Sequence, residues 1–416
     1  MANGLAKRSL TQDLRTICLP CTEEEYGGIV KDAKLFRLWV EKSFAAYPDL
    51  FPGEFAKGFS MADHRTSKKL SLMLRRVELH DGRRFTVRPS FVMPHMTART
   101  DDVHKPLFLR KFGVPYWALA WVFGRNPMYW FRLECRLGNF SVVGTTVRQA
   151  EIPEHLIADE HHQTCDGRKV FLATTVGGGC CLGVAMAATA DTDDLTEAYQ
   201  VFRDEARNVN SDYSPKTVNT DGWKSTQAAW QILFTNIIVL RCFLHAWLKI
   251  RDRAKNLKEK FYELSKQVWH AYHADNKRSF AQRLRHLASW ASKNVSGIIL
   301  EAVQDLCAKK KLWLAAYNHP QAHRTSNMLD RVMRPMNRYF FDGQHLHGGI
   351  DTNEQHVRGW ALLWNFTPWN PAITKANDGW RCPAERLNKH RYHDNWLQNL
   401  LLSASLGGYR IAPQKA

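Results

Sequence analysis

The order of extended and helical segments between residues 151 and 241 constrains the fold more than any other feature of the sequence. In chain order, the segments are strand-like runs at Leu156 to Ala158, Lys169 to Thr175 and Cys180 to Ala187, then a helix over 193–209, a strand over 216–219, a helix over 223–233 and a strand over 236–241. Three glycines at 177–179 allow a tight turn between the second and third runs. We therefore expect a mixed sheet flanked by helices.

This succession of elements is that of the ribonuclease-H-like fold, in which the first and fourth strands are neighbours. Asp159 follows the first strand-like run, and Asp221 ends the fourth one beside Gly222. Taken singly, each aspartate is more often a turn residue or a helix cap than a metal ligand. Their positions at the ends of two neighbouring strands instead predict that the two carboxylates meet.

Carboxylates that converge from neighbouring strands suit metal-dependent phosphoryl transfer. Two divalent ions about 3.5–4 Å apart need hard oxygen ligands from several elements, and they stabilise both the attacking and the leaving oxygen. Without cations the carboxylates repel one another, so their convergence is costly unless metal binding compensates it. We expect Asp159 and Asp221 to be catalytic metal ligands, together with a third acidic residue.

The charge of the chain favours nucleic acid as its partner. The 416 residues include 58 Lys and Arg against 40 Asp and Glu, which gives a net charge of +18 and attracts a polyanion. The 15 Trp residues favour a DNA- or RNA-processing enzyme over a basic packaging protein. The nine Cys residues are irregularly spaced, residues 1–16 contain no apolar leader segment, and no apolar run is long enough to span a membrane. We expect a cytoplasmic protein with reduced thiols and no membrane partner.

The N-terminal part divides into two expected regions. Residues 1–100 are expected to contain a helix over 22–46 and a basic hairpin around Asp81-Gly82. Residues 101–150 are expected to be helical, with breaks at 113–115 and 124–127, and to form a helix-turn-helix-like DNA-binding domain. Arg125 and Arg132 are its expected DNA contacts. A three-helix bundle with an aromatic core is an equally good interpretation of this region.

The second half of the chain contains an expected insertion. Residues 247–320 are helical, basic and rich in Trp, and they interrupt a core that we place at 151–246 and 321–365. Lys249 and Arg251 in this insertion are expected to contact the DNA backbone, although a solvated charged face explains them as well. Residues 366–416 are expected to be an irregular C-terminal tail or a segment that wraps around the core. The expected fold class is thus mixed, α+β or α/β.

Four features together resemble one protein family, the DDE-type transposases of bacterial insertion sequences and their Mutator-like relatives. In that family a first aspartate ends a strand ahead of a hairpin, as Asp159 does, and a second lies at an Asp-Gly or similar strand end, as Asp221 does. A Cys-x-x-His then follows on the fifth strand, matched by Cys242 and His245. After a helical insertion the family has Thr-x-Asn-x-x-Glu, matched here by 325–330 with Asp330 as the acid. The resemblance covers roughly residues 100–370.

The resemblance implies a ribonuclease-H-like core whose three acids, Asp159, Asp221 and Asp330, bind two Mg²⁺ or Mn²⁺ ions. It implies cleavage and strand transfer at transposon ends. Double-stranded DNA, both transposon end and target, is then the partner, and a dimer or larger assembly forms the synaptic complex. Such a protein is associated with the bacterial nucleoid.

The resemblance also assigns supporting residues. Cys242, His245 and Asn327 would lie behind the metal ligands, and Arg324 and Arg331 would face DNA. Cys242 and His245 are both possible zinc ligands, but two ligands alone do not make a tetrahedral site.

The third acid departs from the family pattern, because Asp330 stands where Glu is usual. Glu301 and Glu354 are the alternative candidates, and Glu160 is expected to point to the opposite face of its strand from Asp159. Two other functions also fit the sequence. One is a catalytically inactive, transposase-derived DNA-binding protein, and the other is a ribonuclease-H-like structure-selective nuclease.

Overall fold

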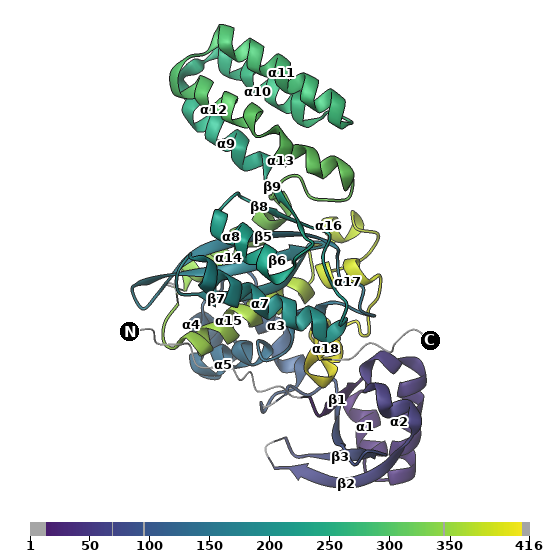
Figure 1. Ribbon diagram of the computed structural model, residues 1–416. Coiled ribbons are helices and arrows are strands. Elements are labelled where there is room, and N and C mark those ends of the chain that lie inside the picture. Colours follow the sequence, from purple (N-terminus) through teal and green to yellow (C-terminus); the bar gives the residue numbers. More distant parts are fainter. Residues whose placement is uncertain (1–13, 69, 95, 344–345, 410–416) are drawn as a thin grey trace.

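The computed structural model describes residues 14–68, 70–94, 96–343 and 346–409. The protein is a mixed α/β structure with 55% helix and two mixed sheets of four and five strands. Figure 1 shows three parts along the length of the molecule. A helical bundle lies at one end, the five-stranded sheet and its helices lie in the middle, and the four-stranded sheet lies at the other end.

The five-stranded sheet has the order β7-β6-β5-β8-β9. Its strands are β5 (His155–Cys165), β6 (Arg168–Gly177), β7 (Cys180–Ala187), β8 (Thr217–Thr220) and β9 (Ile238–Arg241). β5 pairs with β8 and β8 with β9 in parallel, whereas β5, β6 and β7 pair antiparallel. The predicted succession of strands and helices, and the predicted contact between the first and fourth strands, are confirmed.

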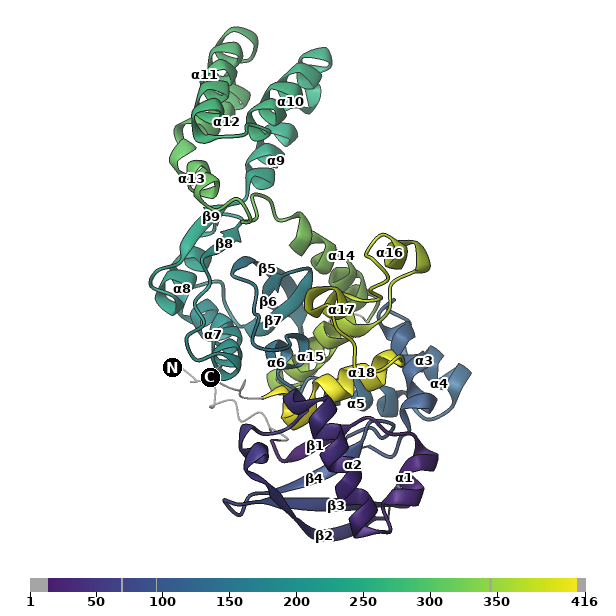
Figure 2. The ribbon, with the colours of Figure 1, turned by 90° about the vertical axis from the view of Figure 1, so that its right-hand side faces the viewer.

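Helices cover both faces of this sheet (Figure 2). The helices on one face are α7 (Thr192–Val209) and α8 (Lys224–Leu233), and those on the other are α14 (Asn327–Asp342) and α15 (Ile350–Phe366). Successive residues of β5 point to opposite faces. Leu156 and Ala158 accordingly join the hydrophobic cluster of α7 and α8, whereas Ile157 joins the cluster that contains residues of α14 and α15. Asp159 follows the direction of Ile157, so it lies on the α14 side.

The N-terminal part contains two strands that the sequence did not suggest. Its sheet, in the order β1-β4-β3-β2, consists of β1 (Thr16–Leu19), β4 (Arg84–Pro89), β3 (Leu72–Leu79) and β2 (Phe59–Ser67). The expectation of one helix over 22–46 is wrong. The segment forms α1 (Glu23–Ile29) and α2 (Ala33–Ala46), because Asp32 accepts hydrogen bonds from Lys34 N and Leu35 N and starts a second helix. Two short 3-10 turns, η1 (Pro48–Leu50) and η2 (Gly53–Lys57), follow.

Helices α3 (Thr100–Arg110), α4 (Tyr116–Phe123) and α5 (Pro127–Leu137) break where the sequence predicted. They do not form a separate bundle, because buried residues of all three belong to the same cluster as those of α15. α5 packs closely on α15: a Cβ on Gly138 would lie 1.8 Å from the carbonyl oxygen of Gln355, and one on Gly359 would lie 2.5 Å from that of Glu134. One face of the helix expected to read DNA is therefore covered by the core. The short helix α6 (Val142–Thr146) follows.

The helical insertion begins earlier than expected, at Phe243. Its elements are α9 (Phe243–Ala254), η3 (Lys255–Leu257), α10 (Glu259–Tyr272), α11 (Lys277–Asn294), α12 (Gly297–Ala308), α13 (Lys310–Leu314) and η4 (Ala315–Asn318). These helices bury a hydrophobic cluster of their own, with Phe243, Leu284 and Trp313 among its members. Figures 1 and 2 show the bundle projecting from the β8–β9 edge of the sheet.

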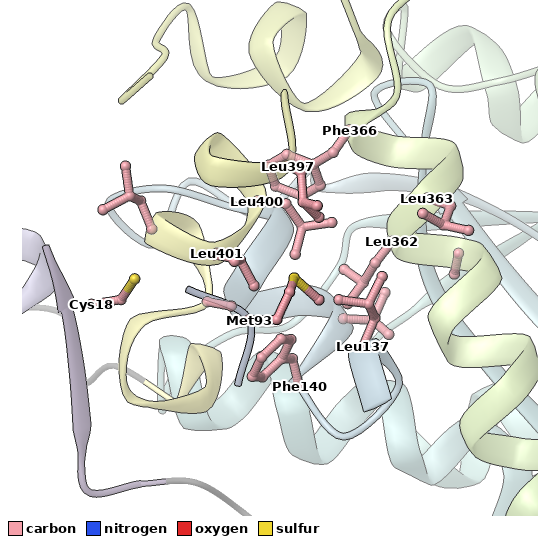
Figure 3. Packing of buried hydrophobic residues seen from close by; sticks show 14 of the residues in the cluster. Cys18, Met93, Leu137, Phe140, Leu362, Leu363, Phe366, Leu397, Leu400 and Leu401 are labelled. Atoms are coloured by element: carbon pink, nitrogen blue, oxygen red, sulfur yellow. The ribbon is translucent and has the colours of Figure 1, made fainter. Parts of the chain in front are cut away.

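The C-terminal segment is not an irregular tail, and the alternative of a wrapping segment describes it. It contains α16 (Pro371–Lys375), α17 (Pro383–Asn388), α18 (Trp396–Ser403) and η5 (Ser405–Gly408). Every residue of α18 is buried, and Figure 3 shows its leucines against Leu362 and Phe366 of α15 and near Met93. Ser405 Oγ accepts a hydrogen bond from Cys18 N at 3.0 Å. The segment thus joins the N-terminal sheet to the central part.

Candidate active site

Asp159 and Asp221 lie on adjacent strands at matching positions. Ile157 of β5 pairs with Asn219 of β8 in parallel register, and each aspartate comes two residues later in its strand direction. The two therefore share one face and one end of the β5–β8 contact. Asp159 was expected at the end of its strand, but it lies inside β5, because the hairpin with β6 continues to Cys165 after β8 has ended. The end of β8 exposes this part of β5.

Each of these aspartates also accepts a hydrogen bond from a backbone N–H that follows it in the chain. Asp159 Oδ1 accepts from Glu160 N at 2.9 Å, and Asp221 Oδ1 accepts from Trp223 N at 2.8 Å. Gly222 has φ +104°, and a Cβ there would lie 2.7 Å from Arg241 Nε. Glycine at 222 thus lets the guanidinium of β9 approach the loop that carries Asp221.

Asp330 reaches the same region from α14. Ser326, the buried residue before this helix, donates its hydroxyl to Asp330 Oδ2 at 3.1 Å. Ser326 N donates to Cys242 Sγ at 3.2 Å, and Cys242 N donates to Thr220 O at 2.7 Å. A chain of hydrogen bonds therefore runs from the end of β8, next to Asp221, through Cys242 and Ser326 to Asp330.

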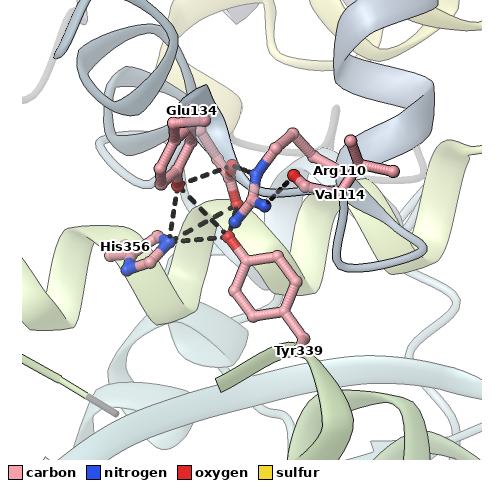
Figure 4. Close-up of polar contacts among 6 residues, drawn as sticks. Arg110, Val114, Glu134, Tyr339 and His356 are labelled. Carbon is pink, nitrogen blue, oxygen red and sulfur yellow. Dashed lines mark hydrogen bonds and ion pairs between the residues drawn. The ribbon is translucent and has the colours of Figure 1, made fainter. Parts of the chain in front are cut away.

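The helix that carries Asp330 is fixed at its other end by a buried polar cluster (Figure 4). Glu134 of α5 is fully buried and accepts from Arg110 Nε at 2.8 Å and from Tyr116 OH at 2.9 Å. Tyr339, on α14, also donates its hydroxyl to Glu134 and contacts His356 Nε2 at 2.7 Å. Although burial raises the pKa of Glu134, the charge of Arg110 and hydrogen bonds from His356 and Tyr339 lower it to about 2. The carboxylate thus stays ionised and ties α3, α5, α14 and α15 together.

The three aspartates interact electrostatically. Burial is the main cause that raises the pKa of Asp159 from 3.8 to about 6, and the charges of Asp221 and Asp330 contribute to this rise. Hydrogen bonding to Cys242 raises the pKa of His245 to about 9, and the charges of Asp159 and Asp221 contribute. Burial raises the pKa of the Cys242 thiol, but hydrogen bonds with His245 and Ser326 outweigh this and leave the pKa below its ordinary value. The acids, Cys242 and His245 thus form one cluster of coupled charges.

The three carboxylates are near one another, but they do not converge on a single point. Within the described ranges, no three or more His, Cys, Asp or Glu side chains are close enough together to hold a metal ion. Each of the three carboxylates has an oxygen bound to a neighbouring N–H or hydroxyl. Mutual repulsion of carboxylates favours such separate hydrogen bonds in the absence of a cation.

The alternative acids lie elsewhere. Glu301 is exposed on α12 in the insertion, and Glu354 is buried on α15. Neither is among the main charges that act on Asp159, whereas Asp330 is. Glu160 points to the other face, as expected, and its carboxylate accepts from Tyr199 OH at 2.6 Å and from Thr226 Oγ1 at 2.9 Å. Burial raises the pKa of Glu160 to about 7.

The predicted DNA-contacting residues are mostly on the surface. Those with exposed side chains are Arg125, Arg132, Lys249, Arg251 and Arg331. Asn327 is exposed as well. Arg125 stacks over Tyr129, and Arg251 pairs with its neighbour Asp252 at 2.9 Å. Arg324 is half-buried, lies 4.5 Å from the ring centre of Tyr272 and donates to Tyr317 OH. Its packing against the insertion leaves Arg324 a smaller surface for DNA than the other residues have.

Sequence reasoning missed Ser326 and Arg241. Ser326 lies four residues before Asp330, which is the spacing of one helical turn, so its position in the 325–330 motif was a usable signal. The approach of Arg241 to Gly222 depends on the pairing of β8 with β9 and has no signal in the local sequence.

None of the described helices is both long and apolar enough to cross a membrane. Comparison with protein-family models gives no match, and comparison with curated proteins gives none either.

Proposed function

We propose that the protein is a DDE-type DNA transposase with a ribonuclease-H-like core, which uses three aspartates and divalent metal ions to cut and join DNA strands. One observation carries the proposal. Asp159, Asp221 and Asp330 come from β5, the end of β8 and α14, yet the charges of the latter two raise the pKa of the first. Separate elements rarely bring uncompensated carboxylates together without a function for them.

The residues at this position fit a hard divalent cation. Three carboxylates supply the oxygen ligands that Mg²⁺ and Mn²⁺ prefer. Asn219 Oδ1, on the same face as Asp159, is buried without a hydrogen-bond partner among the described residues. This oxygen is available to a cation or to water bound by one. Two such ions would supply Lewis-acid stabilisation of the attacking and leaving oxygens.

Specific roles follow for the residues of the chain. Asp159 and Asp221 would bind metal from the sheet, and Asp330 would complete the ligand set from α14. Cys242, Ser326 and Glu134 would position Asp330, and His245 would add positive charge beside a DNA phosphate. Asn327 and Arg331, exposed at the start of α14, and Lys249 on α9 are placed on elements next to the acids. Contact with two DNA ends would require at least two copies of the chain.

A second candidate is a non-catalytic DNA-binding protein derived from such a transposase. One observation favours it: the carboxylates are not arranged as a preformed metal site in the described part of the chain. The net charge of +18 supports DNA binding under either proposal. The two candidates differ in one activity, metal-dependent cleavage of DNA.

The test is cleavage of supercoiled plasmid DNA in Mg²⁺ or Mn²⁺, with EDTA as the blank. Asp221→Asn keeps an oxygen that accepts from Trp223 N but removes a charged ligand, so we expect cleavage to fall by about 100-fold or more. Asp212→Asn, an exposed position, is the matched control and should cleave like the unchanged protein. DNA affinity should be equal in all three proteins.

The outcomes separate the two candidates. Cleavage that needs metal and Asp221 supports the transposase. DNA binding without cleavage in either metal supports the non-catalytic protein. Cleavage that is the same in Asp221→Asn contradicts the proposed site.

A further inference from the structure

We infer that the N-terminal sheet carries a second site, a pocket that binds a phosphate group through Arg88. The pocket has a volume of about 430 Å³ and lies against β1, β2, β3 and β4 and the segment after β4. It is separate from the acidic cluster, and its ligand chemistry does not depend on the proposed catalysis.

The pocket opens on the sheet face opposite to α1 and α2. Arg75 of β3 points toward these helices, since its guanidinium donates to Val30 O and Lys31 O just after α1. Arg76 is the next residue, so it points to the other face, and it pairs with Thr86 of β4. Thr86 and Arg88, two residues apart on β4, both line the pocket on that face.

The polar lining of the pocket is suited to an anion. Among the described residues, the polar side chains that line it are Thr16, Arg65, Thr66, Ser67, Thr86 and Arg88, and none of the lining residues is acidic. Two guanidinium groups surrounded by hydroxyl groups supply charge and hydrogen-bond donors in several directions. A tetrahedral phosphate, with oxygens on all sides, matches such donors better than a planar carboxylate does.

Arg88 is the strongest single indication. Its side chain is only 6% exposed, yet no described carboxylate forms an ion pair with it. Nη1 donates to Val92 O at 2.9 Å, and Nε is buried without a hydrogen-bond partner within the described part of the chain. A buried cation without a counter-charge is costly unless a ligand supplies one. An anion in the adjacent pocket would supply it.

The test measures thermal unfolding in EDTA, with inorganic phosphate against chloride at equal ionic strength. We expect phosphate to raise the melting temperature of the unchanged protein by about 2 °C or more at saturating concentration. The shift should disappear in Arg88→Met and become smaller in Thr86→Val. Because Thr86→Val is a nearly isosteric change, it still tests the pocket if Arg88→Met fails to fold. Arg83→Met, an exposed arginine of the same hairpin, should keep the full shift.

A DNA-binding assay without divalent metal distinguishes two sources of the phosphate. A loss of about three- to tenfold in affinity for a short duplex in Arg88→Met, beyond that in Arg83→Met, assigns the pocket to a DNA phosphate. Unchanged DNA affinity with a lost phosphate shift assigns it to a free phosphate compound. The inference is overturned if phosphate gives the unchanged protein no more stabilisation than chloride, or if Arg88→Met and Thr86→Val both keep the full shift. Because metal is absent, these results do not depend on cleavage.

Discussion

Asp159 of the proposed site has a carboxylate whose ionised form is unfavourable in the folded protein. The proposed metal-binding function explains why such a residue is present. The Asp159 carboxylate is mostly buried, and the charges of Asp221 and Asp330 act on it. The strand and motif context of the three aspartates predicted them as candidate site residues from the sequence. The sequence could not locate Asp159 within its strand, because β5 extends beyond the end of β8 through its pairing with β6. The bond between Ser326 and Cys242, the residue after β9, could not be predicted either, although the spacing of Ser326 from Asp330 was a usable signal.

Replacing Asp159 should stabilise the protein in the absence of metal. Asn keeps an oxygen that accepts from Glu160 N, but it removes a charge that burial and its neighbours disfavour. We expect Asp159→Asn to raise the free energy of unfolding by about 1–3 kcal/mol at pH 8 in EDTA. Denaturant unfolding measures this, with Glu301→Gln on the exposed face of α12 as the control. A destabilised Asp159→Asn protein would contradict the burial and repulsion inferred here.

The pH dependence of that gain has a definite sign. The folded protein holds the Asp159 proton more tightly than the unfolded chain does, because the pKa is about 6 instead of 3.8. Stability from this group is therefore lost as pH rises between these two values. The advantage of Asp159→Asn should be small below about pH 4, grow up to about pH 6 and then stay constant. A gain that is independent of pH would indicate a different cause.

At the scale of elements, α5 packs closely on α15 and also holds α14, the helix of Asp330, through the hydrogen bond from Tyr339 to Glu134. The helices themselves could be predicted, because Gly113, Pro115, Gly124 and Pro127 mark their ends. Their packing could not, since the close approach at Gly138 joins residues more than 200 positions apart in the chain. The two strands β1 and β2 were missed for a related reason. β1 is only four residues long, and β2 carries mostly polar, partly exposed side chains.

Glycine at 138 is required for this helix contact. A Cβ there would lie 1.8 Å from Gln355 O, so Gly138→Ala must separate α5 from α15. We expect a loss of at least about 3 kcal/mol in the free energy of unfolding, or no folded protein. Gly28→Ala in α1, where a Cβ would meet nothing within 4 Å, should not destabilise the protein and should raise the free energy of unfolding by at most about 1 kcal/mol. Equal effects of the two substitutions, measured by thermal unfolding, would refute the proposed close packing.

The Glu134 cluster should determine the acid stability of the helix contact. Glu134 has a lowered pKa, about 2 instead of 4.5, so its contribution is complete above pH 4.5 and is lost as pH falls toward 2. Glu134→Gln should cost about 3–5 kcal/mol at pH 7, because Arg110 is then buried without its counter-charge. The loss should become smaller as pH falls through this window. Glu197→Gln, exposed on α7, is the control in chemical denaturation, and a Glu134→Gln protein as stable as this control would argue against the cluster.

At the scale of the whole molecule, the three parts differ in whether they bury a hydrophobic cluster of their own or share one with another part. The insertion has its own hydrophobic cluster, whereas the N-terminal sheet and the central helices share one that the C-terminal segment completes. The sequence predicted the insertion from its long helical pattern. It gave no comparable signal for α18, whose buried residues pack on partners far away in the chain.

The insertion should therefore fold alone. Residues 243–318, produced as a separate fragment, are expected to be helical by circular dichroism and to unfold cooperatively on heating. A fragment of 350–409, which lacks the partners of α15 and α18, should not unfold cooperatively. A 243–318 fragment without a cooperative transition would show that its core depends on the rest of the chain.

The most direct test of the central proposal is a crystal of the protein soaked in MnCl₂ and measured for anomalous scattering of manganese. We predict manganese peaks between the carboxylates of Asp159, Asp221 and Asp330, and no such peaks in a crystal of Asp221→Asn. Absence of manganese from this position in the unchanged protein, or manganese that remains there unchanged in Asp221→Asn, would contradict the proposed metal site.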